Sequence, residues 1–346
     1  MKINKDEFLQ ALDKVVPGLA KKEIVKEMNY IVSEAGRLYS YNDKLAISVQ
    51  FDTGVDFVVH GKNLYEAIKK SRAKNIEFEI EDDVLVCTIG KVVNEIPLLK
   101  DDLIIKTHAH LNYEEVTYVP LAEDFVKGLE LCATCASKNL NNLYGLYSIR
   151  ITDQDIFATD QVRMLLYEVE TDINTTIFVP AEQVKTIKAF QPIGIAEDFV
   201  SKNWVFFKNE NEDVLGIKLF DVSKKFVSEE RIYSFFDLPE DLPYFKLPKE
   251  IANDLAVVSV FSDEETENVN VNISKEGELS IVSESVKGFS ELYDEIPDYK
   301  GEEITFDINP TLLLEMLKHS AKVLVSDYFI CVQEENLTYL LAQMNK

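Results

Sequence analysis

The stretch YGLYSIRITDQDIFATDQVRMLLYEVE, from Tyr144 to Glu170, decides how this chain folds. Apolar and polar residues alternate along most of it, and the group TDQVR, from Thr159 to Arg163, interrupts the alternation before a second apolar run. Alternation with a period of two is typical of β-strands, and a polar interruption is typical of a turn. The stretch therefore predicts a pair of strands around a charged turn.

This strand pair belongs to a repeat that runs through the whole chain. Four kinds of segment recur in the same order three times, at intervals of roughly 115 to 130 residues. They are a strand leading into an amphipathic helix, a strand pair around a turn, a second strand and helix, and a second strand pair. The first kind is MKINKDEFLQALDKVV, VTYVPLAEDFVKGLELCA and YFKLPKEIANDLAVVSVF, and the third is VDFVVHGKNLYEAIKK, TTIFVPAEQVKTIKAF and EITFDINPTLLLEMLKH. Each copy predicts two helices packed on antiparallel sheets, so the fold class is α+β, with one domain used three times.

Shifts in composition mark the joints between the copies. The first joint is LKDDLIIKTHAHLNYEE, from Leu99 to Glu115, and the second is RIYSFFDLPEDLPYFK, from Arg231 to Lys246, with two prolines and several acidic residues. We therefore expect domains at residues 1–112, 113–243 and 244–346.

Composition limits the class of protein. The chain has 346 residues, 46% of them hydrophobic, a formal net charge of −25 and only four cysteines. No apolar stretch approaches the roughly 20 residues of a membrane span, and the N-terminus lacks a signal-type apolar run. The cysteines are too few for a disulfide framework, which fits a reducing compartment. We expect a soluble cytoplasmic protein without membrane contact. Because a uniformly acidic surface repels phosphate, nucleic-acid binding would need a locally basic face.

The repeat, the turn and the end of the chain together resemble the bacterial β sliding clamp, the processivity subunit of DNA polymerase III. The match is sharpest in LYGLYSIRITDQDIFATDQVRMLLYEVETDINTTIFVPAEQVKTI, where that family has a similar strand, a T-D-x-x-R turn, a strand and a V-P helix start. TYLLAQM is similar to the family's apolar C-terminal strand. The resemblance implies three repeated domains of the DNA-clamp fold that form part of a closed ring. In the family, two chains join head to tail, helices line the hole, and duplex DNA runs through it.

A ring of this kind requires basic inner helices, and the second helix of each copy carries lysines opposite its apolar stripe. An acidic residue, Glu66, Glu182 or Glu315, accompanies them in each copy. The first helices mix lysines and acids and do not follow this pattern. By helix face and by the family's contact loops, the residues expected to bind DNA are Lys21, Lys22, Lys62, Lys69, Lys70, Lys138, Lys185, Lys188, Lys318 and Lys322. Asn141 and Asn142 stand where the family has an aromatic pair.

The resemblance also assigns a role to the turn from Thr159 to Arg163. In the family it borders a hydrophobic pocket where polymerases, the clamp loader and repair proteins dock a short linear motif. The corresponding positions here are Leu143, Thr159, Asp160, Arg163, Met164, Phe329, Cys331, Leu340, Leu341 and Met344. Gln161 and Val162 replace the family's small residue and histidine, and its linker motif is not recognisable in YSFFDLPEDLPY. For the head-to-tail interface, position gives Val92, Val93 and Ile96 in one domain and Val260 and Phe261 in another.

Other chemistry lacks workable spacing. Cys132 and Cys135 form a C-x-x-C without a second pair, inside an apolar helix pattern, and are expected to be buried thiols. His108 and His110 have no third ligand near them in sequence. We therefore expect no enzyme activity, metal or cofactor. The predicted partners are double-stranded DNA bound without sequence preference, a DNA polymerase, clamp-loader subunits and a second copy of the chain. Two alternatives stay open: a clamp-like interaction protein that does not encircle DNA, and an enzyme whose site is assembled from scattered acids.

Overall fold

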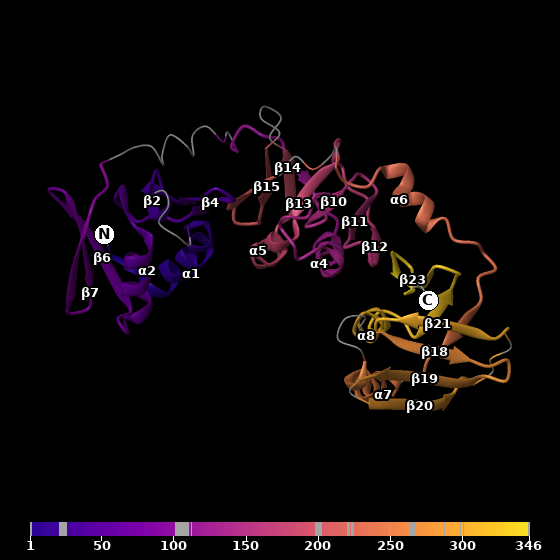
Figure 1. Cartoon of the computed structure of the whole chain (residues 1–346). Helices are drawn as coiled ribbons and strands as arrows, with labels where there is room; N and C mark the ends of the chain where they lie inside the picture. Colours follow the sequence, from indigo (N-terminus) through magenta and orange to yellow (C-terminus); the bar gives the residue numbers. More distant parts are fainter. Residues whose placement is uncertain are drawn as a thin grey trace. The chain divides into compact units, whose positions relative to one another are not determined.

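The computed structural model describes residues 2–20, 26–100, 111, 113–197, 203–219, 222, 225–248, 250–262, 268–286, 288–297, 299 and 301–344 (Figure 1). The chain divides into two compact units. The first joins Met1–Val126 to Thr171–Asp221, and the second joins Lys127–Glu170 to Val222–Lys346.

Two antiparallel sheets build the first unit. The smaller has the order β1-β6-β7-β8, with bounds Lys2–Asn4, Asn75–Glu81, Val84–Ile89 and Val92–Pro97. The larger, of eight strands, has the order β5-β2-β3-β4-β16-β15-β14-β9. Its bounds are Phe57–His60, Tyr30–Glu34, Arg37–Tyr41, Leu45–Gln50, Val214–Lys218, Trp204–Lys208, Gly194–Glu197 and Val119–Pro120. The pairing of β4 with β16 joins the first and second copies of the repeat.

Helices of the first unit bury one stripe and expose the opposite side. They are α1 (Lys5–Val15), η1 (Val16–Gly18), η2 (Lys26–Asn29), α2 (Gly61–Lys70), η3 (Ala181–Gln183) and α5 (Val184–Phe190), the last two following β13 (Ile177–Pro180). Asn4 caps α1, since its side-chain oxygen accepts from the backbone N–H of Asp6 at 2.9 Å. Phe8 and Leu12 are fully buried, and the Phe8 ring lies edge-on to Phe78 of β6 at 5.3 Å. Packing of this apolar stripe holds α1 against the sheets.

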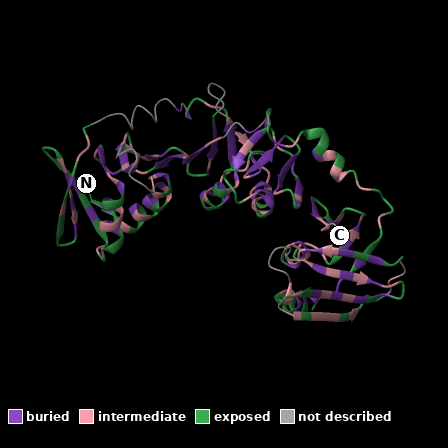
Figure 2. Ribbon diagram, in the orientation of Figure 1, coloured by how far each residue is buried: buried purple, intermediate pink, exposed green. Residues whose placement is uncertain are grey.

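The second unit has the same design. Its larger sheet contains the order β10-β11-β12-β24-β23-β22-β17, with bounds Ser148–Ile151, Asp155–Thr159, Arg163–Glu168, Leu337–Ala342, Phe329–Glu334, Lys322–Val325 and Tyr244–Lys246. The other sheet is β20-β19-β18-β21, with bounds Gly288–Glu295, Glu278–Ser285, Val269–Ile273 and Ile304–Ile308. The helices are α4 (Phe125–Cys135), α6 (Glu229–Phe236), α7 (Ile251–Val258), η4 (Ser259–Phe261) and α8 (Pro310–Leu317). Most strands of the larger sheets are buried, whereas β20 is half-buried or exposed along its length (Figure 2).

The predicted alternation of strand and helix is present in all three copies, because β1-α1, β9-α4 and β17-α7 match one segment kind and β5-α2, β13-α5 and β21-α8 match another. Two expectations were wrong. Residues 231–236, expected in a joint, belong to α6, which begins at Glu229. Lys322, placed on the helix face with Lys318, begins β22 and pairs with Lys246 of β17, because α8 ends at Leu317. The domain boundaries at 112/113 and 243/244 stay a prediction.

Candidate functional site

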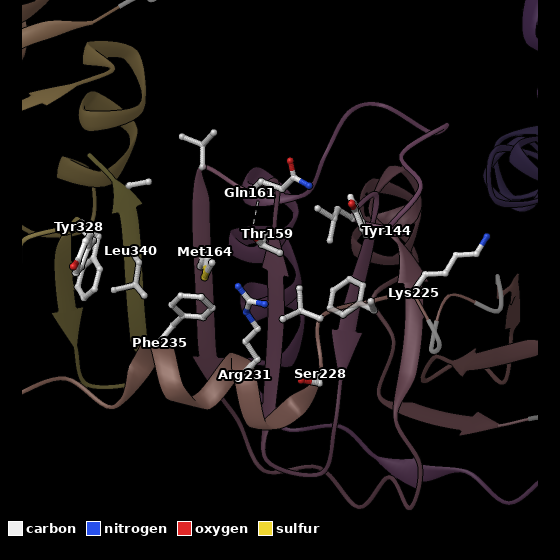
Figure 3. Close-up of a pocket in the computed structure, with 16 residues that line it drawn as sticks. Tyr144, Thr159, Gln161, Met164, Lys225, Ser228, Arg231, Phe235, Tyr328 and Leu340 are labelled. Atoms are coloured by element: carbon white, nitrogen blue, oxygen red, sulfur yellow. Dashed lines mark hydrogen bonds between the residues drawn. The ribbon is translucent and has the colours of Figure 1, made fainter. Parts of the chain in front are cut away.

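A pocket of about 710 Å³ lies in the second unit, over the strands β12 and β24 (Figure 3). Sixteen residues line it: Tyr144, Leu146, Thr159, Gln161, Val162, Met164, Lys225, Phe226, Val227, Ser228, Arg231, Phe235, Tyr328, Phe329, Leu340 and Ala342. Most are apolar or aromatic, and the polar members are few. This composition is typical of sites that bind apolar side chains and orient them with a few polar groups.

Strand register brings one wall together. Met164 of β12 lies opposite Thr159 of β11 and opposite Leu340 of β24, so the three share one face of the sheet. Phe329 lies opposite Ala342 on the same face. Because directly paired residues of antiparallel strands point to the same side, the pairing alone assembles this wall.

Helix α6 supplies the other wall. Arg231 and Phe235, one helical turn apart, face the pocket, and the Arg231 guanidinium lies 5.9 Å from the centre of the Phe235 ring (Figure 3). Ser228 precedes the helix with an extended backbone, and Glu229 and Glu230 occupy its first turn. These are helix-start signals that the sequence contained and that the assignment of a joint overlooked.

A buried polar cluster, named here the α6 anchor and formed by Arg150, Asp155 and Tyr233, fixes this helix to the sheet. The Tyr233 hydroxyl donates to one oxygen of Asp155, and Nη1 of Arg150 donates to the other at 2.9 Å. The Arg150 guanidinium lies 5.6 Å from the centre of the Tyr233 ring. Burial and the bond to Asp155 raise the pKa of Tyr233. Since Arg150 and Asp155 are both nearly inaccessible, the cluster holds α6 in one position.

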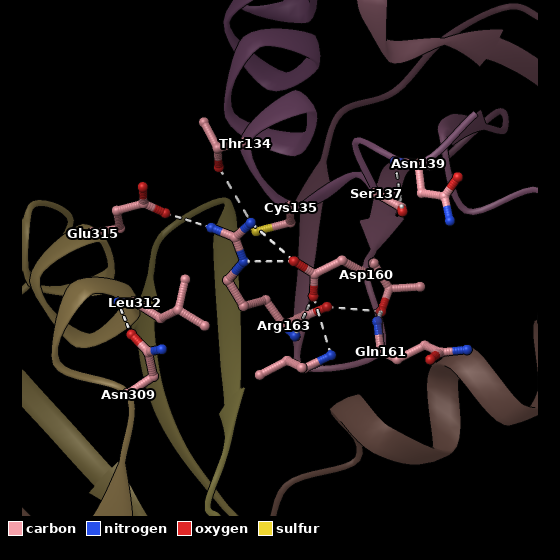
Figure 4. Close-up of polar contacts among 12 residues, drawn as sticks. Thr134, Cys135, Ser137, Asn139, Asp160, Gln161, Arg163, Asn309, Leu312 and Glu315 are labelled. Atoms are coloured by element: carbon pink, nitrogen blue, oxygen red, sulfur yellow. Dashed lines mark hydrogen bonds and ion pairs between the residues drawn. The ribbon is translucent and has the colours of Figure 1, made fainter. Parts of the chain in front are cut away.

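The charged turn is held by its own side chains (Figure 4). The Thr159 hydroxyl donates to the backbone oxygen of Arg163 at 2.7 Å, and Oδ1 of Asp160 accepts from the backbone N–H of Arg163 at 2.8 Å. Gln161 takes a left-handed conformation, with φ of +84°. This conformation favours glycine and small polar residues, which fits the small residue that the resemblance implies at this position.

Arg163 points away from the pocket, toward the helices. Its Nε donates to Asp160 at 3.0 Å, its Nη1 pairs with Glu315 of α8, and its guanidinium lies beside Cys135 of α4 (Figure 4). Burial opposes the charged form, but the charge of Asp160, its hydrogen bond and the neighbouring groups together outweigh burial and raise the pKa of Arg163 above its usual range. The resemblance assigned Arg163 to the pocket, whereas the structure places its side chain outside the lining.

Of the ten residues predicted for the pocket, the structure brings four to it: Thr159, Met164, Phe329 and Leu340. The other six do not line it: Leu143, Asp160, Arg163, Cys331, Leu341 and Met344. Leu341 lies opposite Arg163 and shares its face, because neighbouring positions of a strand point to opposite sides. Cys331 lies opposite Leu340 on the pocket face of the sheet, but it is fully buried and is not part of the lining. Leu143 is 79% exposed outside the pocket, and Met344 forms a bridge with Asp307.

The four cysteines are free and buried, as expected. Burial raises the pKa of Cys87 and Cys331 to about 12 and that of Cys135 to about 11, and it also raises the pKa of Cys132. At neutral pH these side chains are protonated thiols, which neither bind zinc nor attack disulfides.

The lysines predicted to contact DNA fall in several environments. Those on α2 and α5, namely Lys62, Lys69, Lys70, Lys185 and Lys188, are exposed, as are Lys138 and Lys318. Lys322 lies over the Tyr244 ring at 4.5 Å. Lys21 and Lys22 lie outside the described residues.

Each acid that accompanied these lysines in the sequence has an ion-pair partner. Glu66 pairs with Lys70 at 3.0 Å, Glu182 pairs with Lys44 at 2.8 Å, and Glu315 pairs with Arg163. For Glu182 and Glu315 the partner lies on another element and is not a lysine of the same helix. The lysine next to α8 is Lys318, which follows the last helical residue, Leu317. On α2 the pair uses Lys70, and Lys62 and Lys69 provide the excess positive charge.

The residues predicted for contact between copies lie at two sheet edges. β8 is an edge strand, with Val92 and Val93 at 58% and 60% exposure and Ile96 buried. Val260 is 64% exposed in η4. Phe261, next to it, packs on Gly288, where an added Cβ would come within 3.0 Å of the ring.

The described ranges contain neither a metal-site cluster nor a helix that could span a membrane. No three His, Cys, Asp or Glu side chains there converge on a metal site, and His108 and His110 fall outside these ranges. No helix in the described part of the chain has the length and apolar character required to cross a membrane.

Comparison with known proteins supports the fold. No protein-family model matches the sequence, and no curated protein matches it. The DNA polymerase sliding clamp from Bacillus subtilis superimposes with a TM-score of 0.82 at 16% identity, covering 100% of this chain and 98% of that one. The beta subunit of DNA polymerase from Streptococcus pyogenes gives 0.82 at 17% identity, with 100% and 99% covered. The Helicobacter pylori beta clamp, in complex with 3,4-difluorobenzamide, gives 0.81 at 15% identity, with both chains fully covered. The chain therefore has the sliding-clamp fold over its full length.

Proposed function

We propose that this chain is a DNA sliding clamp, a protein without catalytic activity that encircles duplex DNA and tethers a replicative polymerase and a clamp loader. The observation that carries the proposal is the agreement of the fold with bacterial sliding clamps along the entire chain. In this proposal the three copies of the repeat, residues 1–112, 113–243 and 244–346, are the clamp domains. Two chains close head to tail into a ring in the cytoplasm.

The charges of the helices support a DNA-facing role. α2, α5 and α8 occupy equivalent positions in the repeat, and each carries or ends at an exposed lysine in a chain of net charge −25. A few lysines on rigid helices hold phosphates without contacting base edges. Such a lining retains DNA of any sequence and lets it slide.

The pocket supports a peptide-binding role. Its volume lies within the roughly 300–1,000 Å³ of ordinary ligand sites, and its apolar walls suit aliphatic and aromatic side chains of an extended segment. A polymerase or loader tail that carries such side chains would be tethered to the clamp there.

The test combines sedimentation with loading on nicked circular DNA. We expect a dimer, retention on circular DNA, and loss of the protein when the same DNA is cut to a short linear form. A monomer that still binds partner peptides would instead favour a clamp-like interaction protein that does not encircle DNA. Steady hydrolysis of nucleotides, esters or peptides that one substitution abolishes would contradict the absence of catalysis.

A further inference from the structure

The charge of the pocket differs from that of the chain. The chain has 61 acidic and 36 basic residues, yet the pocket lining contains two bases, Lys225 and Arg231, and no Asp or Glu. Both side chains are exposed, and none of the ion pairs in the described ranges involves either of them. Arg231 extends from α6 toward Thr159 and Met164, and Lys225 lies on the side of Tyr144 (Figure 3). A ligand that enters the pocket therefore meets positive charge.

The first unit contains the corresponding seam between strands. β4 and β16 pair with Ala46 opposite Gly216, just as β12 and β24 pair with Met164 opposite Leu340. Tyr41 lies opposite Ala46 as Thr159 lies opposite Met164. The repeat thus makes the face of Ala46 in the first unit equivalent to the pocket face of Met164 in the second.

In the first unit this face is covered by the chain itself. The segment LNYEEVTY, of which residues 111 and 113–118 are described, supplies Leu111 and Tyr113 to a buried cluster with Ala46, and the Tyr113 ring lies 6.2 Å from that of Phe206. Val116 and Tyr118 pack against the same cluster. The covering segment thus combines aliphatic and aromatic anchors.

Two acidic residues lie between these anchors. Glu114 and Glu115 are both exposed, whereas Tyr113 next to them is buried. Burial raises the pKa of Tyr39, and the charges of Arg37 and Glu114 act on the same hydroxyl. Arg37 of the sheet and Glu114 of the covering segment therefore both lie near the Tyr39 hydroxyl.

The lining of the pocket is positively charged, and an acidic and apolar segment covers the equivalent face of the first unit. From these two observations we infer that the pocket of the second unit binds an extended peptide of the same chemistry as residues 111–118. Its aliphatic and aromatic anchors fill the pocket, and a carboxylate next to them lies against Arg231 and Lys225. The inference rests on the proposed function, since it takes the pocket to be a partner site. The carboxylate is that of an acidic side chain, as Glu114 and Glu115 are in residues 111–118; the carboxyl end of a partner chain is the other source that the test distinguishes.

Three labelled probes separate these sources: LNYEEVTY with an amidated end, LNYQQVTY with an amidated end, and LNYQQVTY with a free carboxyl. Fluorescence polarisation measures their affinity for the full-length protein at about 0.05 M salt, where charge pairs are least screened. We expect LNYEEVTY amide to bind about five-fold or more tightly than LNYQQVTY amide, the effect of one partly exposed charge pair. A gain shown only by the free-carboxyl probe would overturn the assignment to an acidic side chain.

Substitutions assign the gain to its residues. Arg231→Gln combined with Lys225→Gln should make the acidic and amide probes equal, whereas Lys246→Gln, an exposed base outside the pocket, should leave the difference unchanged. Met164→Glu should abolish binding of every probe. Equal binding of all three probes to the parent protein, or no binding, would overturn the inference. Retention on circular DNA, measured on the same preparation, tests the proposed clamp function separately.

Discussion

Arg163 and Met164 show how one position along a strand separates two roles. Met164 lies on the pocket face of β12, whereas Arg163 lies on the helix face, paired with Asp160 and Glu315. Alternation along the strand predicts that the two point to opposite sides. It does not predict which side carries the pocket, because that depends on where α6 packs.

We expect Arg163→Gln to lower the free energy of unfolding by about 2 kcal/mol, below the ~3–5 of a fully buried pair because Glu315 is 40% exposed. The affinity of this variant for LNYEEVTY should change less than about two-fold, since Arg163 lines no part of the pocket. Met164→Glu should do the opposite, losing the peptide because it places a charge among the apolar anchors. Urea unfolding and peptide titration of both variants measure this contrast. Loss of peptide binding with unchanged stability in Arg163→Gln would make Arg163 a pocket residue after all.

Helix α6 is the element that turns a sheet face into a pocket. The sequence around it contains two prolines and was interpreted as a joint, although Ser228 and the two glutamates after it are helix-start signals. The partners that hold it, Arg150 and Asp155, precede it by about 80 residues. Sequence periodicity reports local structure, and an interaction across such a distance leaves no periodic signal.

Tyr233→Phe tests whether the α6 anchor positions the pocket wall. The change removes the hydroxyl that donates to buried Asp155, which should lower the free energy of unfolding by about 1–2 kcal/mol. Although Tyr233 does not line the pocket, peptide affinity should fall several-fold, and backbone amides of α6 should exchange faster with solvent. Tyr244→Phe, an exposed tyrosine on β17, is the matched control. Weaker binding with unchanged exchange in α6 would rule out positioning through the helix.

At the scale of the molecule, the fold was predictable because the repeat presents each element three times. The division into compact units was not predictable from the repeat. β4 pairs with β16, and β12 pairs with β24, so each larger sheet combines strands from two successive copies. The compact units therefore divide the chain at positions other than the joints in sequence.

The proposed association of two copies would use exposed sheet edges. β8 and β20 are both edge strands, and an unprotected edge favours pairing with another chain. We expect Phe261→Glu to shift the sedimentation of the protein toward monomer, because the charge replaces a ring that packs on Gly288 beside β20. Ile193→Glu, which changes an exposed apolar residue of the first unit, should leave the dimer intact. An equally stable dimer in Phe261→Glu would mean that the copies meet elsewhere.

In the proposed function, retention on DNA and binding of peptides use different residues and should therefore be separable. Lys62 and Lys69 are exposed on α2 and are not used by the ion pair of Glu66, so they are the sharpest DNA test on that helix. Changing both to glutamate should weaken retention on nicked circular DNA. It should also reduce the slope of log affinity against log salt by about 0.9 for each phosphate that the protein no longer neutralises. The affinity for LNYEEVTY should not change, since neither lysine lines the pocket. Met164→Glu should lose the peptide and keep both DNA retention and its salt slope. If each variant lost both activities, the sheet face and the helix face would not act as independent sites, and a single coupled surface would replace the two argued from this structure.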